Sequence, residues 1–336
     1  MLRFIVRRLL QMALALFVLS ILLFAWLRSL PGGPVSALLG ERGTVESRAA
    51  LERQLGVDQP LWVQYGRFLK RALSGDFGIS NGVRPGTDAL DLFLTRLPAT
   101  VELSVFAMIL AVGLAIPLGY IAARRQGGAL DTGSIIGSLV GVAVPVFFLA
   151  FVLKYIFAVR MGLLPPSGRQ TVGIDATRIT GFFVVDGIMT REWDAAWDAF
   201  KHLILPAVAL SSIPFAVIFR ITRASVLEVM DEDYVRTARA KGLNAPVIRS
   251  RHIMRNALIP VVTIIGLQIG ALLAGAVLTE TVFAFPGIGQ ALALGFQKKD
   301  YAVLQVLIMM AALIYIVVNL LVDIAYAVID PRVRTR

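Results

Sequence analysis

Residues 202–222 read HLILPAVALSSIPFAVIFRIT, and after eight intervening residues a charged run, DEDYVRTARAKGL, follows at 231–243. The first segment has the length of about 20 residues that a helix needs to cross a hydrocarbon core of about 30 Å. Of the 336 residues in the chain, 57% are hydrophobic and only 16% are charged. This composition predicts an all-α integral membrane protein, because a helix satisfies its own backbone hydrogen bonds in lipid.

Apolar runs long enough to span a membrane occur six times. They lie at 9–30, 98–122, 134–159, 202–222, 257–283 and 303–328. The first run is too long for a cleaved secretory signal and lacks a small-residue cleavage site before Pro31, so we expect a retained helix. The expected division is an N-terminal helix with an outward-facing amphipathic segment at 1–97 and a five-helix core at 98–336.

The outward segment at 31–97 contains signals for two short helices. Thr44 is a candidate N-cap for a helix at 45–55, and Asp58 with Pro60 opens a second helix that ends near Gly75. The second helix carries apolar residues at three-and-four spacing, which favours packing on the membrane or on the ends of the spans. These residues are Trp62, Tyr65, Phe68, Leu69 and Leu73.

Basic residues are concentrated at alternate ends of the spans. Sixteen of them precede the first span, follow the second, lie between the fourth and fifth, or close the chain: Arg3, Arg7, Arg8, Arg124, Arg125, Arg220, Arg223, Arg236, Arg239, Lys241, Arg249, Arg251, Arg255, Arg332, Arg334 and Arg336. Only six acidic residues accompany them, so these regions hold +10 of the formal net charge of +11. Since short loops rich in Lys and Arg stay in the cytoplasm, we expect both termini and the loop 223–256 to be cytoplasmic.

Several kinds of chemistry are missing from the sequence. No Gly-Lys pair occurs, so the phosphate-binding loop G-x-x-x-x-G-K-[S/T] is absent. The only histidines, His202 and His252, form no H-E-x-x-H motif, and there is neither a G-x-S-x-G elbow nor a cysteine. The basic residues lie at span ends without aromatic partners, which argues against nucleic acid binding. We therefore expect a non-catalytic chain with no metal or cofactor of its own.

Ionisable residues inside the apolar spans are expensive and often face a transport pathway. Lys154 and Asp323 lie deep in their spans, and Asn319 is one turn before Asp323 on the same helix face. We predict these three as pathway residues, with a purely structural Lys154–Asp323 ion pair left open. Glu102 and Glu280 lie near outer span ends, where we expect solvent to reach them.

Small residues and prolines mark further features of the spans. Gly133, Gly137 and Gly141 recur every fourth position, as do Gly266, Gly270 and Ala274, and such rows allow close helix packing, which we expect mainly within the chain. Kinks are expected at the prolines inside the apolar runs. These prolines are Pro117, Pro145, Pro206 and Pro214.

The charged run at 231–243 predicts a cytoplasmic helix of roughly three turns. Acidic residues stand at its start, Arg236, Arg239 and Lys241 stand near its end, and both sets complement the helix dipole. Gly242 follows as a C-terminal cap. Pro246 then opens a second amphipathic stretch before the fifth span. We expect something outside the bilayer to pack on the first helix.

This region resembles a known family. The stretches YVRTARAKGL (234–243) and RHIMRNALIPVVT (251–263) are similar to the coupling loop of the membrane subunits of ABC importers, in the form found in dipeptide and oligopeptide permeases. Further agreement covers nearly the whole chain, in MLRFIVRRLL (1–10), LRSLPGGP (27–34), GERG (40–43), SGDFGIS (74–80), LPPSGR (164–169), TETVFAFPGIG (279–289) and DPRVR (330–334). Arg236 and Thr237 replace the first two residues of the broader E-A-A-x-x-x-G pattern, whereas Ala238 and Gly242 retain it.

The resemblance implies a type I ABC importer permease with six transmembrane helices in the bacterial cytoplasmic (inner) membrane. It also implies a second homologous permease subunit, two ATPase subunits that bind ATP and Mg, and an external substrate-binding protein. The loop 231–256 would couple the chain to the ATPases through Asp233, Tyr234, Arg236, Thr237, Ala238, Lys241 and Gly242. Tyr234, Thr237 and Ala238 are expected to face the ATPase groove.

The resemblance leaves the ligand open. It favours dipeptides or short oligopeptides, but glutathione, nickel complexes and haem precursors are carried by close relatives of the family. A stand-alone secondary transporter is the alternative from another class, although the sequence shows no internal repeat of the kind that many such transporters contain.

Overall fold

The computed structural model describes residues 2–29, 58–174 and 176–329. Within these ranges the chain is helical, and the only β-type pairing is an isolated bridge between Ile79 and Asp88. The elements are α1 (Leu2–Ser29), α4 (Leu61–Leu73), α5 (Ala89–Arg124), α6 (Ala129–Ala143), α7 (Val146–Leu153), η2 (Lys154–Arg160), α8 (Phe183–Met189), α9 (Trp193–Met230), α10 (Asp233–Ala240), α11 (Ala245–Val247), η3 (Ile248–Met254), α12 (Arg255–Val282), α13 (Ile288–Gln297) and α14 (Tyr301–Ile329). The expected helix at 45–55 lies outside the described residues.

Five helices in the described part of the chain are long and apolar enough to cross a membrane. The expected third span is different, because α6 and the continuous helix formed by α7 and η2 meet the test together but are bent by 104° at the break between α6 and α7. Val144 has extended backbone there and Pro145 caps α7, so the helix stops where proline disfavours the helical conformation of the preceding residue. Pro117 lies within α5, and Pro206 and Pro214 lie within α9, without ending those helices.

By packing, the chain forms two units, which comprise Met1–Pro98 with Pro286–Arg336 and Ala99–Phe285. The expected division into 1–97 and 98–336 separates consecutive stretches of sequence, whereas these units are defined by packing. That division therefore stays a prediction. Unit 1 contains α1, α4, α13 and α14 together with the start of α5, whereas unit 2 contains the rest of α5 and the helices from α6 to α12.

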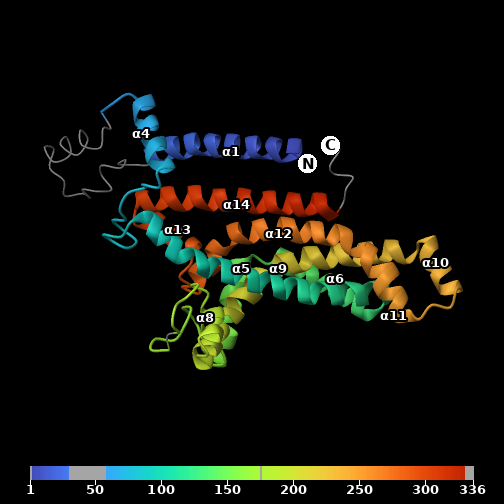
Figure 1. Cartoon of the computed structure of the whole chain (residues 1–336). Coiled ribbons are helices and arrows are strands. Elements are labelled where there is room, and N and C mark those ends of the chain that lie inside the picture. The colour runs from blue at the N-terminus through green and yellow to red at the C-terminus, as the bar shows by residue number, and fades with distance from the viewer. Residues whose placement is uncertain (1, 30–57, 175, 330–336) are drawn as a thin grey trace. The chain divides into compact units, whose positions relative to one another are not determined.

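In unit 1, α1 and α14 lie side by side and antiparallel (Figure 1), so the start of α1 and the end of α14 are at the same end. Leu23 and Leu27 of α1 pack against Leu304 of α14. The helix α4 begins close to its expected start and packs on α1 through Tyr65, whose hydroxyl is 2.8 Å from Ser20 Oγ. Trp62 of the same stripe remains exposed.

A buried carboxylate fixes the loop before α5 in unit 1. Asp300 is 2% exposed and accepts hydrogen bonds from Ser80 Oγ at 2.6 Å, Gly82 N at 2.8 Å and Val83 N at 2.9 Å. The turn-rich stretch at 76–87 therefore has a defined conformation, attached to the junction of α13 and α14.

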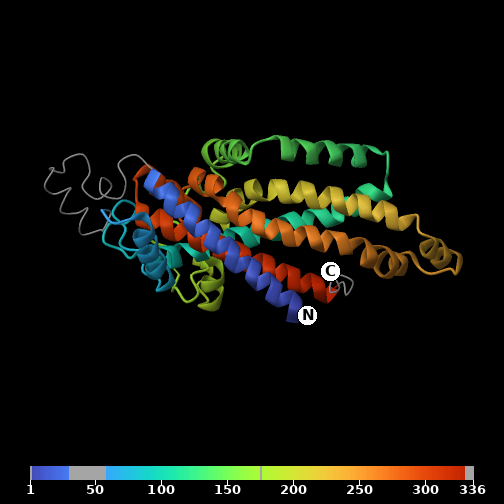
Figure 2. The same ribbon diagram turned by 90° about the horizontal axis from the view of Figure 1, so that it is seen from above.

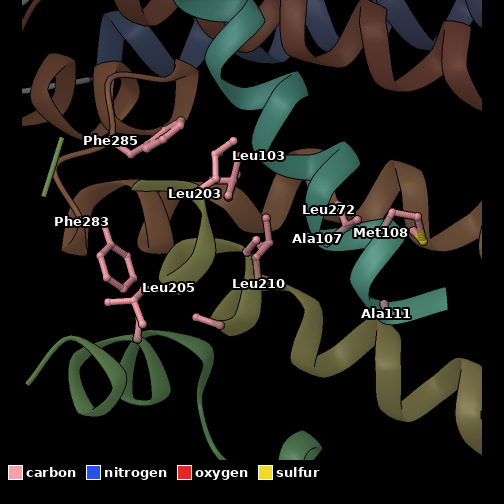
Figure 3. Packing of buried hydrophobic residues seen from close by; sticks show 14 of the residues in the cluster. Leu103, Ala107, Met108, Ala111, Leu203, Leu205, Leu210, Leu272, Phe283 and Phe285 are labelled. Atoms are coloured by element: carbon pink, nitrogen blue, oxygen red, sulfur yellow. The ribbon is translucent and has the colours of Figure 1, made fainter. Parts of the chain in front are cut away.

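The core of unit 2 is built from α5, α9 and α12. Figure 3 shows Leu103 and Ala107 of α5 close to Leu203 of α9 and Leu272 of α12. The crossing of α5 and α9 is close, because a Cβ added to Gly119 would lie 2.9 Å from Thr222 Cβ. Small residues at helix crossings allow this approach where lipid provides no hydrophobic drive for association.

The glycine row on α6 has a different environment from the one expected. A Cβ added at Gly133 or Gly137 would meet no atom within 4 Å in the part of the chain that the structure describes, and only Gly141 comes within 3.7 Å of Ser212 O. No part of the chain that the structure describes therefore covers Gly133 or Gly137. Figure 2 shows α6 and α7 at the edge of unit 2.

Candidate coupling surface and its supporting contacts

The helix α10 covers Asp233–Ala240, which is about two turns and shorter than the three expected. Asp231 caps the end of α9, and Glu232 has an extended backbone and caps the start of α10. The first acidic residues of the charged run therefore lie between the two helices. Gly242 adopts φ +74°, and Leu243 N donates to Ala238 O at 3.3 Å, as in a left-handed helix cap. Figure 1 shows α10 beyond the end of α9 that is opposite to α8.

The apolar face of α10 is attached to the membrane-spanning helices. Val235 and Ala238 are 0% and 4% exposed, and they pack in one cluster with Ala123 of α5, Val226 of α9 and Ile253 of η3. A displacement of α10 must therefore act on the ends of these helices, because packed cores are not continuously deformable.

The polar face of α10 is accessible. Tyr234 is 40% exposed, and Arg236, Thr237 and Lys241 are exposed as well. Asn256 Nδ2 donates a 2.9 Å hydrogen bond to Tyr234 Oη, which connects this face to the start of α12. Of the three residues expected to face an ATPase groove, Tyr234 and Thr237 are accessible, whereas Ala238 lies against the chain's own cluster.

The second amphipathic stretch after Pro246 forms α11 and η3. Ile248 and Ile253 point into the same cluster as Val235 and are 7% and 5% exposed. The loop 223–256 is therefore a compact structure in which two helical pieces share one small core.

Lys154 and Asn319, two of the predicted pathway residues, belong to different units of the chain. Lys154 begins the π-helical segment η2, and its Nζ donates a 2.8 Å hydrogen bond to Val282 O. Asn319 is half-buried on α14 in the other unit. The side chain of Asp323 lies outside the described residues, so the Lys154–Asp323 pair stays a prediction.

The expectation that solvent reaches Glu102 and Glu280 is wrong for this chain. Glu102 is 3% exposed and accepts from Arg169 Nε at 3.2 Å and from Val184 N at 2.9 Å. Glu280 is fully buried and accepts from Thr100 Oγ1 at 2.6 Å. Both carboxylates are satisfied by partners distant in sequence, as buried charges must be.

Carboxylates also fix the segment between η2 and α9. Asp186 accepts from Thr180 N at 2.8 Å, and Asp198 accepts from Thr171 N at 2.6 Å.

Burial lowers the pKa of Arg169, although the charge of Glu102 opposes this change. Arg169 is not among the site residues that the sequence predicts, and the one signal for it is Glu102, an acidic residue in a span that needs a cation.

At the other end of unit 2, Arg223 of α9 binds Asp131 of α6, with a 2.8 Å hydrogen bond from Nη2 to Oδ2. In the sequence, these two residues stand out only by their charges. Gly127 N donates to the same carboxylate at 2.9 Å, so this pair fixes the short connection between α5 and α6.

Comparison with known proteins assigns the chain to a family. The model of the binding-protein-dependent transport system inner membrane component matches residues 115–335, and the model of the N-terminal part of such a component matches residues 1–104. In the described residues no group of three or more His, Cys, Asp or Glu side chains could hold a metal ion.

Curated relatives match over nearly the full length. The dipeptide transport system permease protein DppB of Alkalihalophilus pseudofirmus is 41% identical over 99% of this chain and 100% of its own. DppB of Escherichia coli K12 is 43% identical over 99% of both chains, and the di/tripeptide permease DppB of Pseudomonas aeruginosa is 44% identical over 99% of both. A crystal structure of an amino acid ABC transporter overlaps 72% of this chain at 16% identity, but its TM-score of 0.46 is too low to add to the assignment. The chain belongs to the family of binding-protein-dependent transport system inner membrane components, and it is a multi-pass permease subunit of the cytoplasmic membrane.

Proposed function

We propose that the chain is one membrane half of an ATP-driven importer for dipeptides or short oligopeptides, moved by ATPase subunits that bind α10. The observation that carries this proposal is the two-sided character of α10. One face, with Arg236 and Thr237, is accessible, and the other face is packed on the ends of α5 and α9. A partner that shifts α10 would therefore shift membrane-spanning helices.

The peptide ligand is proposed from the relatives, three of which are described as dipeptide or di/tripeptide permeases. The chain lacks a phosphate-binding loop, which supports ATP binding by separate subunits. Glutathione, a nickel complex or a haem precursor are the other ligands to be tested.

A second permease subunit and an external binding protein complete the proposed assembly. The uncovered glycines Gly133 and Gly137 on α6 support the first, since such a surface suits close packing with another helix. A surface pocket of about 860 Å³ beside the exposed Trp193 and Trp197 supports the second, because aromatic residues are enriched at interfaces.

The coupling role is tested by substitutions on the two faces of α10. Thr237→Arg adds a bulky charge to the accessible face, and it should release the ATPase subunits while the permease still folds. Ala238→Arg forces a charge into the buried cluster and should displace α10. The measurements are copurification of the ATPase subunits and ATP hydrolysis stimulated by the loaded binding protein.

Lys70→Glu is the matched control, because Lys70 is an exposed basic residue on α4, which belongs to the other unit. It should retain both ATPase subunits and their activity. Normal copurification of the ATPase subunits and normal ATP hydrolysis in Thr237→Arg would contradict the coupling role of α10. Mass spectrometry of the cargo of the cognate binding protein identifies the ligand, and uptake by the chain alone in an ion gradient would favour a secondary transporter instead.

A further inference from the structure

The helix α4 lies across the C-terminal end of α1, within unit 1 (Figure 1). Its level along α1 is fixed by direct contacts. Gln64 Oε1 accepts a 2.8 Å hydrogen bond from Arg28 Nε, and the ring centre of Tyr65 lies 5.3 Å from that of Phe24. The helix α4 therefore stands beside the last two turns of α1.

The charges of α1 locate the membrane along this helix. The stretch 9–27, between Arg8 and Arg28, contains no charged residue. At 1.5 Å per residue it is about 28 Å long, which matches a hydrocarbon core of about 30 Å. Arg28 thus marks one polar boundary, and Phe24 lies about 6 Å further into the bilayer. The other end of α1 is the more basic one and is predicted to be cytoplasmic, so α4 lies at the outer boundary.

The contacts with α1 also fix which flank of α4 faces the bilayer. Tyr65 reaches inward, because its hydroxyl is 2.8 Å from Ser20 Oγ and its ring centre is 6.4 Å from that of Phe17. Gln64 reaches in the opposite direction, to Arg28. Successive residues of an α-helix are about 100° apart, so the flank next to Tyr65 points toward the acyl chains and the flank next to Gln64 points toward water.

The side chains on the two flanks differ in the way that this orientation requires. Trp62, Leu69 and Leu73 lie on the inward flank, and Trp62 and Leu73 are 76% and 81% exposed although both are large and apolar. Arg67 and Arg71 lie on the outward flank and are exposed. An apolar flank beside a basic one is the pattern of a helix that lies in a membrane interface.

We propose that α4 lies in the interface of the outer leaflet and inserts Trp62 and Leu73 among the first acyl carbons of the lipids. Interfacial helices bury their apolar face about 5–10 Å into the boundary between headgroups and acyl chains, and Phe24, which Tyr65 contacts, stands at that depth. Trp62 suits this level, because amphipathic rings are favoured where hydrocarbon meets water.

Insertion of α4 would set the height of the following outward stretch above the bilayer. The chain leaves α4 through the turn-rich stretch 76–87, which Asp300 attaches to the junction of α13 and α14. Lipid contacts of α4 would therefore also fix where this stretch stands relative to the membrane surface. The inference is independent of the role proposed for α10, because it concerns unit 1 alone.

The test uses the absence of cysteine from the sequence, since single cysteines can be introduced and labelled with a nitroxide. The variants are Trp62→Cys and Leu73→Cys, and Arg67→Cys is the matched control on the opposite flank. Each full chain is purified with the subunits that accompany it and placed in vesicles of phosphatidylethanolamine and phosphatidylglycerol. The wild-type chain, treated identically, provides the blank for cysteines of other subunits.

The measurement is the collision rate of each nitroxide with oxygen, which concentrates among acyl chains, and with a water-soluble nickel chelate. At positions 62 and 73 the ratio of oxygen to nickel collisions should be several-fold higher than at position 67. The Leu73→Cys variant alone decides the matter if Trp62→Cys fails to assemble, because the Leu73 side chain is the more exposed.

Two results would overturn the proposal. A ratio at positions 62 and 73 as low as at position 67 would place the inward flank of α4 in water. Low collision rates with both reagents at positions 62 and 73 would mean that protein covers this flank, either another subunit or another segment of the chain.

Discussion

Lys154 Nζ donates a 2.8 Å hydrogen bond to the carbonyl oxygen of Val282, which is the last residue of α12. The last carbonyls of a helix have no partner within the helix, and a cation there also complements the helix dipole. The ammonium group thus stabilises the junction between η2 and the end of α12, and it lies 5.9 Å from the centre of the Phe283 ring. These contacts give a structural reason for the presence of Lys154 in an apolar segment.

The first prediction is that Lys154→Met destabilises the fold. A hydrogen bond to a charged group contributes about 1.5–3 kcal/mol, and Met retains the apolar part of the side chain. The apparent melting temperature of the purified full chain should therefore fall, while Lys154→Arg should recover part of the loss. An unchanged melting temperature combined with reduced peptide uptake would instead identify Lys154 as a pathway residue.

The second prediction concerns the buried pair of Glu102 and Arg169. Glu102→Gln leaves a guanidinium that is 6% exposed without its counter-charge, so the chain should lose about 3–5 kcal/mol of stability. The double variant Glu102→Leu with Arg169→Met should regain most of this loss, because a hydrophobic pair of similar volume replaces a buried ion pair at little cost. Thermal melting of the single variants Glu102→Leu and Arg169→Met and of the double variant gives the coupling energy, and additive losses would contradict a direct interaction.

The spans were predictable because each needs only a long apolar run, a property that is local in sequence. The Glu102–Arg169 contact was not, since 67 residues separate the two and four arginines of the following outward loop were possible partners. The bend at Pro145 could be expected, but its angle depends on packing. The burial of Ala238 could have been predicted, because Ala238 lies three residues after the apolar Val235 and hence on the same face of a helix.

The third prediction is that acid loosens the segment before α9. Burial raises the pKa of Asp186, but hydrogen bonds from Thr180 and Gly181 outweigh it and hold the pKa below its usual value. Because the folded pKa is depressed, this contribution to stability is present above the unfolded pKa of about 3.9 and is lost as the pH falls through the folded pKa. Proteolysis within 176–192 should therefore accelerate below about pH 4.

Asp186→Asn should remove most of this acceleration, because the amide does not titrate. Hydrogen bonds from Thr177 lower the pKa of Glu192 in the same region, so Glu192→Gln is the matched control for a second titrating carboxylate. Glu192 is more exposed than Asp186, and its replacement should have the smaller effect. An identical pH profile in wild type and Asp186→Asn would contradict the assigned role.

The last prediction compares two glycines on α5. A Cβ at Gly119 would lie 2.9 Å from Thr222 Cβ and 3.1 Å from Phe219 O, so Gly119→Ala must push α5 and α9 apart and should cost about 1–3 kcal/mol. Gly113 has no atom within 4 Å of an added Cβ in the described part of the chain, so Gly113→Ala should be neutral or stabilise the helix by about 0.5–1 kcal/mol. The melting temperature should therefore fall in Gly119→Ala and stay the same or rise in Gly113→Ala. Equal shifts would mean that the α5–α9 crossing is looser than the structure shows, and that displacement of α10 need not be transmitted through it.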